Sequence, residues 1–150
     1  MNWLDPFQAG DFGYDAFFET IGTVILGRVT YEQVRGLGNW PYAGKRGMVL
    51  SSTPLADLPE GVEQWWAPVE DLVSDLQRKN PGDIWMVGGA RTIGAFLDLG
   101  AVDEMALFVM PLLLGDGIPL FGHLRSEMSL RLRGTQRYAS GVVKLVYGGL

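Results

Sequence analysis

The stretch IWMVGGART, residues 84–92, decides the fold of this 150-residue chain. It has the pattern of a short buried strand that ends in two glycines and runs into a helix, because Ile93, Phe96 and Leu97 follow at helical spacing. Glycines at a strand end let a ligand approach backbone N–H groups, and a helix N-terminus attracts anions. The stretch therefore favours a phosphate-binding turn, although a turn that needs glycine only for its geometry explains it equally well.

Two earlier segments have a related form. VILGRVTYE, residues 24–32, predicts a strand followed by a helix that begins near Thr30, and MVLSST, residues 48–53, predicts a strand that ends in hydroxyl groups. Alone, the first suggests a surface Arg28 beside a helix-capping Thr30, and the second a polar turn before Pro54. Together, the three strand ends predict one phosphate-rich ligand lying across a sheet, which indicates a dinucleotide cofactor.

Strands and helices alternate along the rest of the chain, which predicts one α/β domain, residues 1–150, with a largely parallel sheet covered on both sides. The apolar run over residues 104–110 predicts a strand buried on both faces. The expected helices cover residues 14–21, 30–36, 68–79 and 90–99, and the expected strands cover residues 23–26, 47–50, 62–66, 84–87 and 104–110, followed by an antiparallel pair at 128–135 and 141–147.

Composition excludes several classes of function. The formal net charge of −5 disfavours nucleic acid and anionic lipid as partners, and the absence of cysteine excludes thiolate chemistry. With one histidine, His123, no multi-histidine metal site forms, and no metal is expected. The longest apolar run, residues 105–114, contains Pro111 and is shorter than the ~20 residues of a membrane span. No secretory signal is visible, so we expect a cytoplasmic protein that acts on a small molecule.

No catalytic residue is singled out by the sequence. A Ser-His-Asp arrangement would need His123, which lacks a nucleophile-elbow motif, and a proton donor would have to be chosen among Asp5, Asp11 and Asp15. The loop LGDGIPLF, residues 114–121, would wall a substrate pocket with Asp116 near it, but a solvated Asp-Gly turn explains the same pattern at least as well.

In order and spacing, the segments 24–32, 49–52 and 86–90 resemble the dihydrofolate reductase fold. The later stretches LGAVDEM, residues 99–105, and PLLLGDGIPLF, residues 111–121, resemble one branch of it. That branch contains the reductase domain of the bifunctional riboflavin-biosynthesis deaminase-reductase and its stand-alone relatives. The resemblance covers the chain from about Asp11 onward. It implies a three-layer α/β sandwich with a mostly parallel central sheet and a C-terminal antiparallel hairpin.

The resemblance implies an NADPH-dependent reductase that transfers a hydride to a small heterocyclic, pterin- or pyrimidine-like substrate. A non-catalytic nucleotide-binding or structural relative is the alternative, and a hydrolase is a distant third. By position, the family's cofactor phosphates would contact Gly27, Arg28 and Thr30. Its adenosine ribose and 2′-phosphate would lie at Ser51 and Ser52, and its pyrophosphate at Gly88, Gly89, Ala90, Arg91 and Thr92. The nicotinamide and substrate end would lie near Leu114, Gly115, Asp116 and Gly117.

Two departures from the family pattern carry expectations of their own. Ala90 stands where a third glycine is usual, and the opening MNWLDP, residues 1–6, resembles the segment directly after the family's central first strand. We therefore expect that strand to be absent. Its gap would be closed by direct pairing of the neighbouring strands, by another segment or chain, or by a start upstream of Met1. The apolar surface of residues 105–114 and of the closing strands predicts a homodimer, as does the resemblance.

Overall fold

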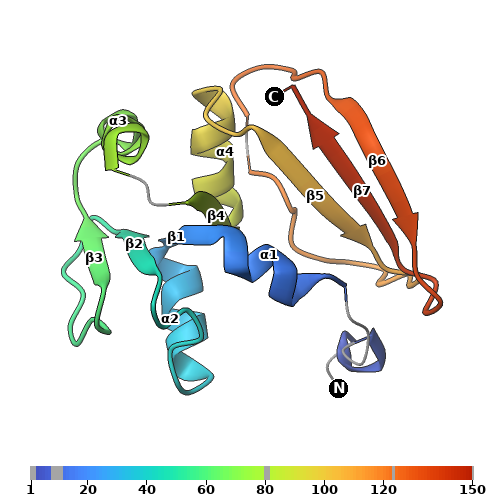
Figure 1. The fold of residues 1–150 in the computed structure, drawn as a ribbon, viewed down its shortest axis with the longest axis horizontal. Helices are drawn as coiled ribbons and strands as arrows, with labels where there is room; N and C mark the ends of the chain where they lie inside the picture. The colour runs from blue at the N-terminus through green and yellow to red at the C-terminus, as the bar shows by residue number, and fades with distance from the viewer. Residues whose placement is uncertain (1–2, 8–11, 80–81, 123, 150) are drawn as a thin grey trace.

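A parallel four-stranded sheet in the order β3-β2-β1-β4 forms one half of the molecule (Figure 1). The computed structural model describes residues 3–7, 12–79, 82–122 and 124–149. The strands of this sheet are β1 (Ile21–Gly27), β2 (Arg46–Leu50), β3 (Val62–Trp65) and β4 (Asp83–Gly88). All three pairings are parallel, which confirms the parallel sheet predicted from the alternation of strands and helices.

Helices cover both faces of this sheet. The helices are α1 (Tyr14–Thr20), α2 (Arg28–Gly36), α3 (Val69–Lys79) and α4 (Ala90–Asp98), and a short 3-10 helix, η1, spans Asp5–Phe7. Successive residues of a strand point to opposite faces. Val24 and Leu26 of β1 accordingly pack in one core cluster with residues of α1 and α2, and Ile25 packs in a second cluster with residues of α3 and α4. The three-layer sandwich is therefore confirmed.

The last three strands form a second, antiparallel sheet in the order β5-β7-β6. They are β5 (Glu104–Val109), β6 (Arg131–Arg137) and β7 (Val143–Gly148). The predicted C-terminal antiparallel pair is present as β6 and β7, and the chain reverses where the Tyr138 N–H donates to the Val142 carbonyl at 2.9 Å. The antiparallel part has three strands because β5 pairs with β7 and not with the parallel sheet.

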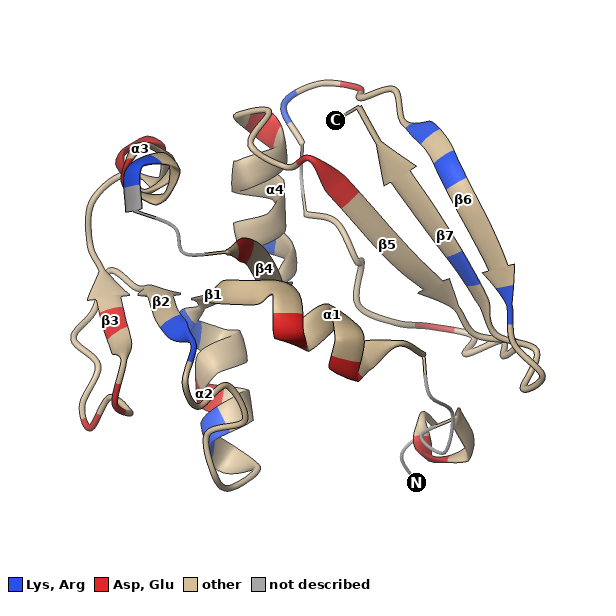
Figure 2. Ribbon diagram, in the orientation of Figure 1, with Lys and Arg blue, Asp and Glu red and all other residues tan. Residues whose placement is uncertain are grey.

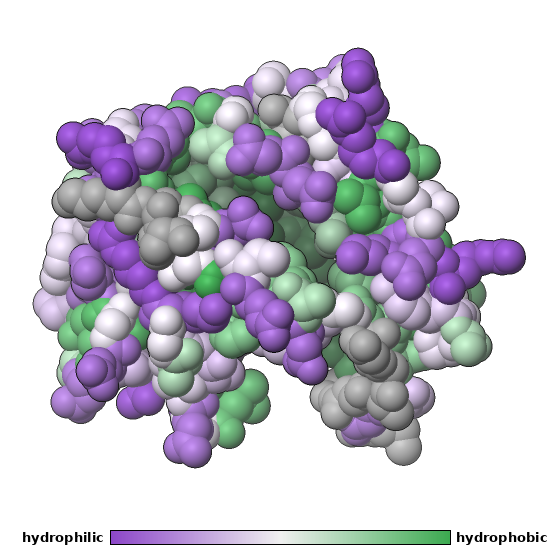
Figure 3. Space-filling model, viewed as in Figure 1, coloured by the Kyte–Doolittle hydropathy of each residue, from purple (hydrophilic) through white to green (hydrophobic). Residues whose placement is uncertain are grey.

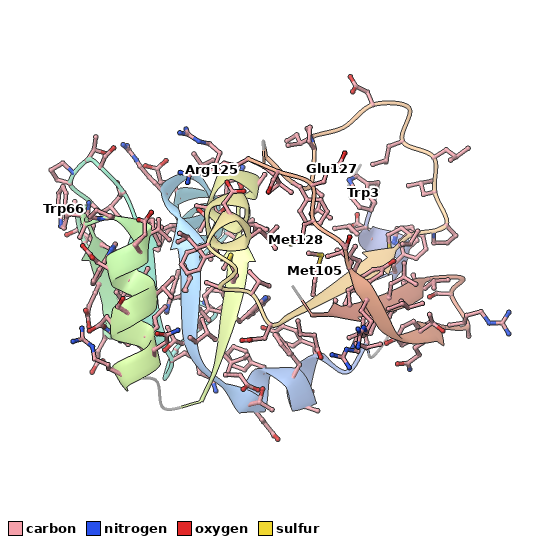
Figure 4. The ribbon with its side chains drawn as sticks, turned by 90° about the horizontal axis from the view of Figure 1, so that it is seen from above. Trp3, Trp66, Met105, Arg125, Glu127 and Met128 are labelled. Carbon is pink, nitrogen blue, oxygen red and sulfur yellow. The ribbon has the colours of Figure 1, made fainter. Side chains whose placement is uncertain are left out.

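The parallel sheet ends at β4 and the antiparallel sheet ends at β5, and we call the space between these two edge strands the open seam. Within the described ranges, β4 pairs with β1 and β5 pairs with β7, so each strand has one edge outside a sheet. Figure 3 shows a hollow at the centre of the face that is viewed in Figure 1, with apolar residues in its depth. Figure 4 places Met105 and Met128 in the space between β4 and β5. Direct pairing of these two strands is therefore not how the space is closed.

The exposure of β5 corrects one expectation. Phe108 and Val109 are 38% and 52% exposed, although the apolar run predicted burial on both faces. A continuous apolar run is typical of a core strand, but this strand borders the open seam and lacks a second strand neighbour among the described residues.

Basic residues gather on one strand of the antiparallel sheet. Figure 2 shows basic residues on β6, where Arg131, Arg133 and Arg137 lie, while acidic and basic residues mix on α2, α3 and α4 and the charged residues of α1 are all acidic. Across the described ranges, none of the helices combines the length and apolar character that crossing a bilayer requires.

Candidate functional site

Three strand ends lie side by side at one edge of the parallel sheet. β1 ends at Gly27, β2 ends at Leu50 just before Ser51, and β4 ends at Gly88. The strand register pairs Gly27 with Leu50, and Leu26 with Gly88. The three ends therefore share one edge, as a single ligand lying across the sheet requires, and cofactor binding at that edge stays a prediction.

Two helices begin at the same edge. α2 starts at Arg28 and α4 at Ala90, and each is nine residues long. Their N-cap residues are Gly27 and Gly89, and neither helix start has a side-chain cap. The first-turn N–H groups of a helix have no partner within the helix, so these two starts offer donors to an anion.

The expected helix-capping role of Thr30 is wrong. α2 begins two residues before Thr30, because Gly27 takes the N-cap position with an extended backbone, φ −77° and ψ 158°. Thr30 consequently lies in the first turn of α2, where its hydroxyl faces the glycine turn after β4: a Cβ atom on Gly89 would lie 3.2 Å from Thr30 Oγ1.

The glycine turn is closely surrounded. Gly88 has φ +137°, a left-handed conformation that favours glycine, and the Gly88–Gly89 peptide bond is cis. A Cβ atom on Gly27 would lie 2.5 Å from Thr92 Oγ1, so Gly27 is required by packing whether or not a ligand binds. The structure thus brings together Gly27, Thr30, Gly88, Gly89 and Thr92, all of which were predicted site residues.

Arg28 joins the end of β1 to the turn after β2. Its Nε donates to Glu32 Oε1 at 2.7 Å, one helical turn along α2, and its Nη1 donates to Thr53 Oγ1. Both members of the Arg28–Glu32 ion pair are about half exposed. A guanidinium has five N–H donors, so these two bonds leave Arg28 with donors for a phosphate.

The turn after β2 has an internal hydrogen-bond network. Ser51 is buried, and its hydroxyl donates to the Thr53 carbonyl at 2.6 Å and accepts from the Thr53 N–H at 3.2 Å. Ser52, next along the turn, is exposed, as is Arg91 in the first turn of α4. Ser52 and Arg91 are therefore predicted cofactor-binding residues whose side chains are open to solvent.

The predicted substrate-side loop, residues 114–117, does not share the hydrogen-bond network given above for the turn after β2. Residues 114–117 are exposed, and Asp116 Oδ1 accepts the N–H of Gly117 at 2.7 Å, as expected for a solvated Asp-Gly turn. Further along the loop, a Cβ atom on Gly122 would lie 3.2 Å from the Ala90 carbonyl, and the Arg125 N–H donates to Asp98 Oδ1 of α4 (Figure 4). This later part of the loop is the part that packs against α4.

Aromatic side chains lie on the α1 and α2 face of the sheet. The Trp85 ring from β4 contacts the rings of Tyr14, Phe17 and Tyr42 at centroid distances of 6.0, 5.2 and 5.5 Å. Burial, and then the neighbouring Tyr14, raises the pKa of Tyr42 above its usual 10.0. The Tyr42 phenol therefore keeps its proton at neutral pH and packs as an aromatic side chain.

A proton donor does not emerge from the described residues. Asp15 is exposed on α1, while Asp11 and His123 lie outside the residues that the structure describes. Within the described ranges, no group of three or more acidic, histidine or cysteine residues is arranged to hold a metal ion. The site therefore offers backbone donors, hydroxyl groups and the guanidinium groups of Arg28 and Arg91, a donor set suited to phosphate.

The three-layer sandwich with this turn at the end of its parallel strands has the architecture of the dihydrofolate reductase-like fold. The chain belongs to the RibD C-terminal domain family, whose model matches residues 51–144. That match includes the turn after β2 and the glycine turn, and it begins after Gly27 and Arg28.

Individual proteins agree with this membership. The protein YwjB of Bacillus subtilis (strain 168) is 38% identical over 144 residues, which cover 95% of this chain and 83% of YwjB. A crystal structure of a putative riboflavin biosynthesis protein from Shewanella sp. PV-4 has a TM-score of 0.80 at 30% identity, over 94% of this chain and 81% of that one.

A more distant structure shares the fold alone. It is a diaminohydroxyphosphoribosylaminopyrimidine deaminase/5-amino-6-(5-phosphoribosylamino)uracil reductase from Thermotoga maritima, with a TM-score of 0.67 at 15% identity. The alignment covers 91% of this chain and 48% of that chain. The family and these structures together establish a reductase-like fold related to riboflavin biosynthesis.

Two residues of the site, Glu32 and Gln64, and the bond between Thr53 and Arg28 were not predicted from the sequence. Glu32 follows Arg28 by four positions on one helix, a spacing that signals an ion pair and was readable from the sequence. Thr53 belongs to the predicted run of hydroxyl groups after β2, but its bond to Arg28 spans 25 positions. Gln64, which holds that turn, comes from β3 and carried no local signal.

Proposed function

We propose that this protein is an NADPH-dependent reductase that transfers a hydride to a small heterocyclic substrate of the pterin or pyrimidine type. The observation that carries the proposal is the shared edge, where two helix starts without side-chain caps meet Arg28 and the hydroxyls of the turn after β2. Membership of the RibD C-terminal domain family supports it, since the Thermotoga maritima protein of the same fold is by name a deaminase and 5-amino-6-(5-phosphoribosylamino)uracil reductase.

Each part of the edge has a task under this proposal. The first-turn N–H groups of α2 and α4 bind the pyrophosphate, and Gly88 and Gly89 let it approach the backbone. Arg28 and Ser52 bind the 2′-phosphate on the adenosine ribose, and Ser51 shapes the turn that carries Ser52. The bound nicotinamide supplies the hydride, so the protein's contribution is position and electrostatics.

The test of this proposal is an activity screen with the purified chain. Loss of the reduced-nicotinamide absorbance is followed with NADPH and a panel of carbonyl, pterin and pyrimidine compounds. We expect turnover with a heterocyclic substrate. Binding of NADPH without turnover of any compound in the panel would contradict the enzymatic part of the proposal.

A nucleotide-binding protein without catalytic activity is the second candidate. The open seam between β4 and β5 favours it, because a substrate pocket bounded by that seam lacks one wall among the described residues. The activity screen separates the two candidates, and a chain that binds no nucleotide at all would contradict both.

Replacing Arg28 tests the choice of cofactor. A hydrogen bond to a charged group contributes about 1.5–3 kcal/mol, which corresponds to a roughly 10- to 150-fold change in affinity. We expect Arg28→Ala to weaken NADPH binding by a factor in that range and to leave NADH binding nearly unchanged. Fluorescence titration of the wild type and of Arg28→Ala with NADPH and with NADH measures the effect.

The matched control is Arg35→Ala, which removes the same charge from the last turn of the same helix. It should leave both affinities unchanged. An equal loss of NADPH and NADH affinity in Arg28→Ala would show that Arg28 does not recognise the 2′-phosphate.

The exposed apolar loop after β5 supports a homodimer. Leu113 and Ile118 are 98% and 94% exposed, and Leu112, Leu114 and Leu120 are each about half exposed. Apolar patches of this kind mark interaction surfaces. We expect sedimentation at micromolar concentration to give a dimer, and Leu113→Glu with Ile118→Glu to give a monomer.

Leu37→Glu is the control for this assembly experiment. Leu37 follows α2 and is 89% exposed, so its replacement changes apolar exposure and charge away from the loop. The dimer should survive in this variant. A wild type that is monomeric at micromolar concentration would contradict the proposed homodimer.

A further inference from the structure

The Gln64 side chain spans the turn that follows β2. Its Oε1 accepts the Leu55 N–H at 2.9 Å. Its Nε2 donates to the carbonyl oxygens of Ser51 and Thr53 at 3.0 and 2.7 Å. A glutamine amide has two N–H donors and one acceptor oxygen, so both donors and the acceptor are engaged by one five-residue segment.

These bonds hold the groups of the turn that face Arg28. The two carbonyls that Gln64 binds belong to Ser51 and Thr53, and the Thr53 hydroxyl accepts from the guanidinium of Arg28. Gln64 is therefore linked to Arg28 through a single intervening residue. It reaches the turn from β3, whose register places Gln64 opposite Val49 of β2.

A turn that carries functional hydroxyls gains precision from such a support. Ser51 contributes an internal bond to Thr53, but both partners belong to the turn and move with it. Gln64 is anchored in the sheet, so it fixes the turn relative to the strand ends and to α2. Supporting bonds of this kind keep the groups that touch a ligand in their binding geometry.

We propose that Gln64 is a positioning residue that sets the preference for a dinucleotide bearing a 2′-phosphate, without itself touching the cofactor. This inference rests on the proposed NADPH site. Gln64 holds the turn so that the exposed Ser52 and the Thr53-bound Arg28 present their donors to one phosphate. A purely structural Gln64 would lower stability and leave the ratio of NADPH to NADH affinity unchanged.

The experiment replaces Gln64 by methionine, which has a similar length and shape and makes no comparable hydrogen bonds. We expect the Kd for NADPH to rise about tenfold, the effect of misplacing one charge-assisted hydrogen bond, while the Kd for NADH changes less than about twofold. 2′-AMP, which carries the same phosphate without a nicotinamide, should lose affinity to the same degree as NADPH.

Two further variants keep the test decisive. Gln64→Glu keeps the acceptor for the Leu55 N–H but loses both donors, so it should also lower the NADPH-to-NADH preference if Gln64→Met fails to fold. Val62→Ala removes a buried side chain from the same strand and should lower the melting temperature without changing the preference.

The outcomes separate this inference from the proposed function. A wild-type chain that binds neither NADPH nor 2′-AMP overturns the proposed NADPH site. A wild type that prefers NADPH, together with Gln64 variants that keep the full preference or lose both cofactors equally, overturns the role of Gln64 alone. Loss of the preference in the Gln64 variants but not in Val62→Ala supports it.

Discussion

Gly89→Val abolishes NADPH binding while most of the fold survives: this is the expected result at the glycine turn. Gly89 is the N-cap residue of α4 and has φ −89° and ψ −165°, an extended conformation that valine also adopts. The effect therefore comes from space. A Cβ atom at this position would lie 3.2 Å from Thr30 Oγ1, and the two valine methyl groups would extend further into the space between the glycine turn and the first turn of α2.

The expected loss is large because several donors act together. A side chain on Gly89 keeps the pyrophosphate from the backbone N–H groups at the start of α4, and two lost bonds to a charged group correspond to at least about 100-fold in affinity. Circular dichroism reports the fold, and fluorescence titration reports binding. Gly134→Val on β6, where a Cβ atom has open space, is the control and should bind NADPH like the wild type.

One result would contradict this expectation. If Gly89→Val keeps its circular dichroism and binds NADPH with wild-type affinity, the glycines after β4 serve only the geometry of the turn. That alternative was open from the sequence, and the close approach of Thr92 to Gly27 shows that packing alone already requires one glycine at this edge.

The parallel half of the fold was predictable because its signals are local. β1 and β4 contain apolar runs that end at glycine, and the apolar run of β2 ends directly before Ser51. Buried parallel strands have this appearance in sequence. The start of α2 was misplaced because Thr30 has the side chain of a good N-cap, whereas Gly27 satisfies the geometry without a side chain. N-cap propensity predicts which residue types start a helix well, but the position of this N-cap is set by the end of β1 at Gly27.

The other contacts of the site could not be predicted because they join residues that are far apart in the sequence. Gln64 lies 11 positions from Thr53, and Thr53 lies 25 positions from Arg28, so their bonds follow from the β2–β3 register and from the crossover between β1 and β2. The exposure of β5 could not be predicted from the sequence for a different reason. An apolar run has the same pattern whether it is buried in a core or borders an open seam, and only the pairing of neighbouring strands distinguishes the two.

The open seam carries the second large prediction: a family-type first strand, grafted ahead of residue 1, stabilises the protein. β4 and β5 each present one unpaired edge among the described residues, and Ile84, Phe108 and Val109 are partly exposed beside it. Burying three partly exposed apolar side chains contributes about 3 kcal/mol in all. The new backbone hydrogen bonds largely offset the entropy of ordering the strand.

For a domain of this size, about 3 kcal/mol corresponds to a rise of roughly 6–12 °C in melting temperature. The resemblance places the same strand at the wall of the substrate pocket, so we expect the graft to raise turnover more than NADPH affinity. The control is a graft of equal length with two interior prolines, which cannot donate to a β-ladder and should leave both properties unchanged. If the grafted protein matches the parent in melting temperature and in reductase activity, the seam between β4 and β5 is not a vacant strand position.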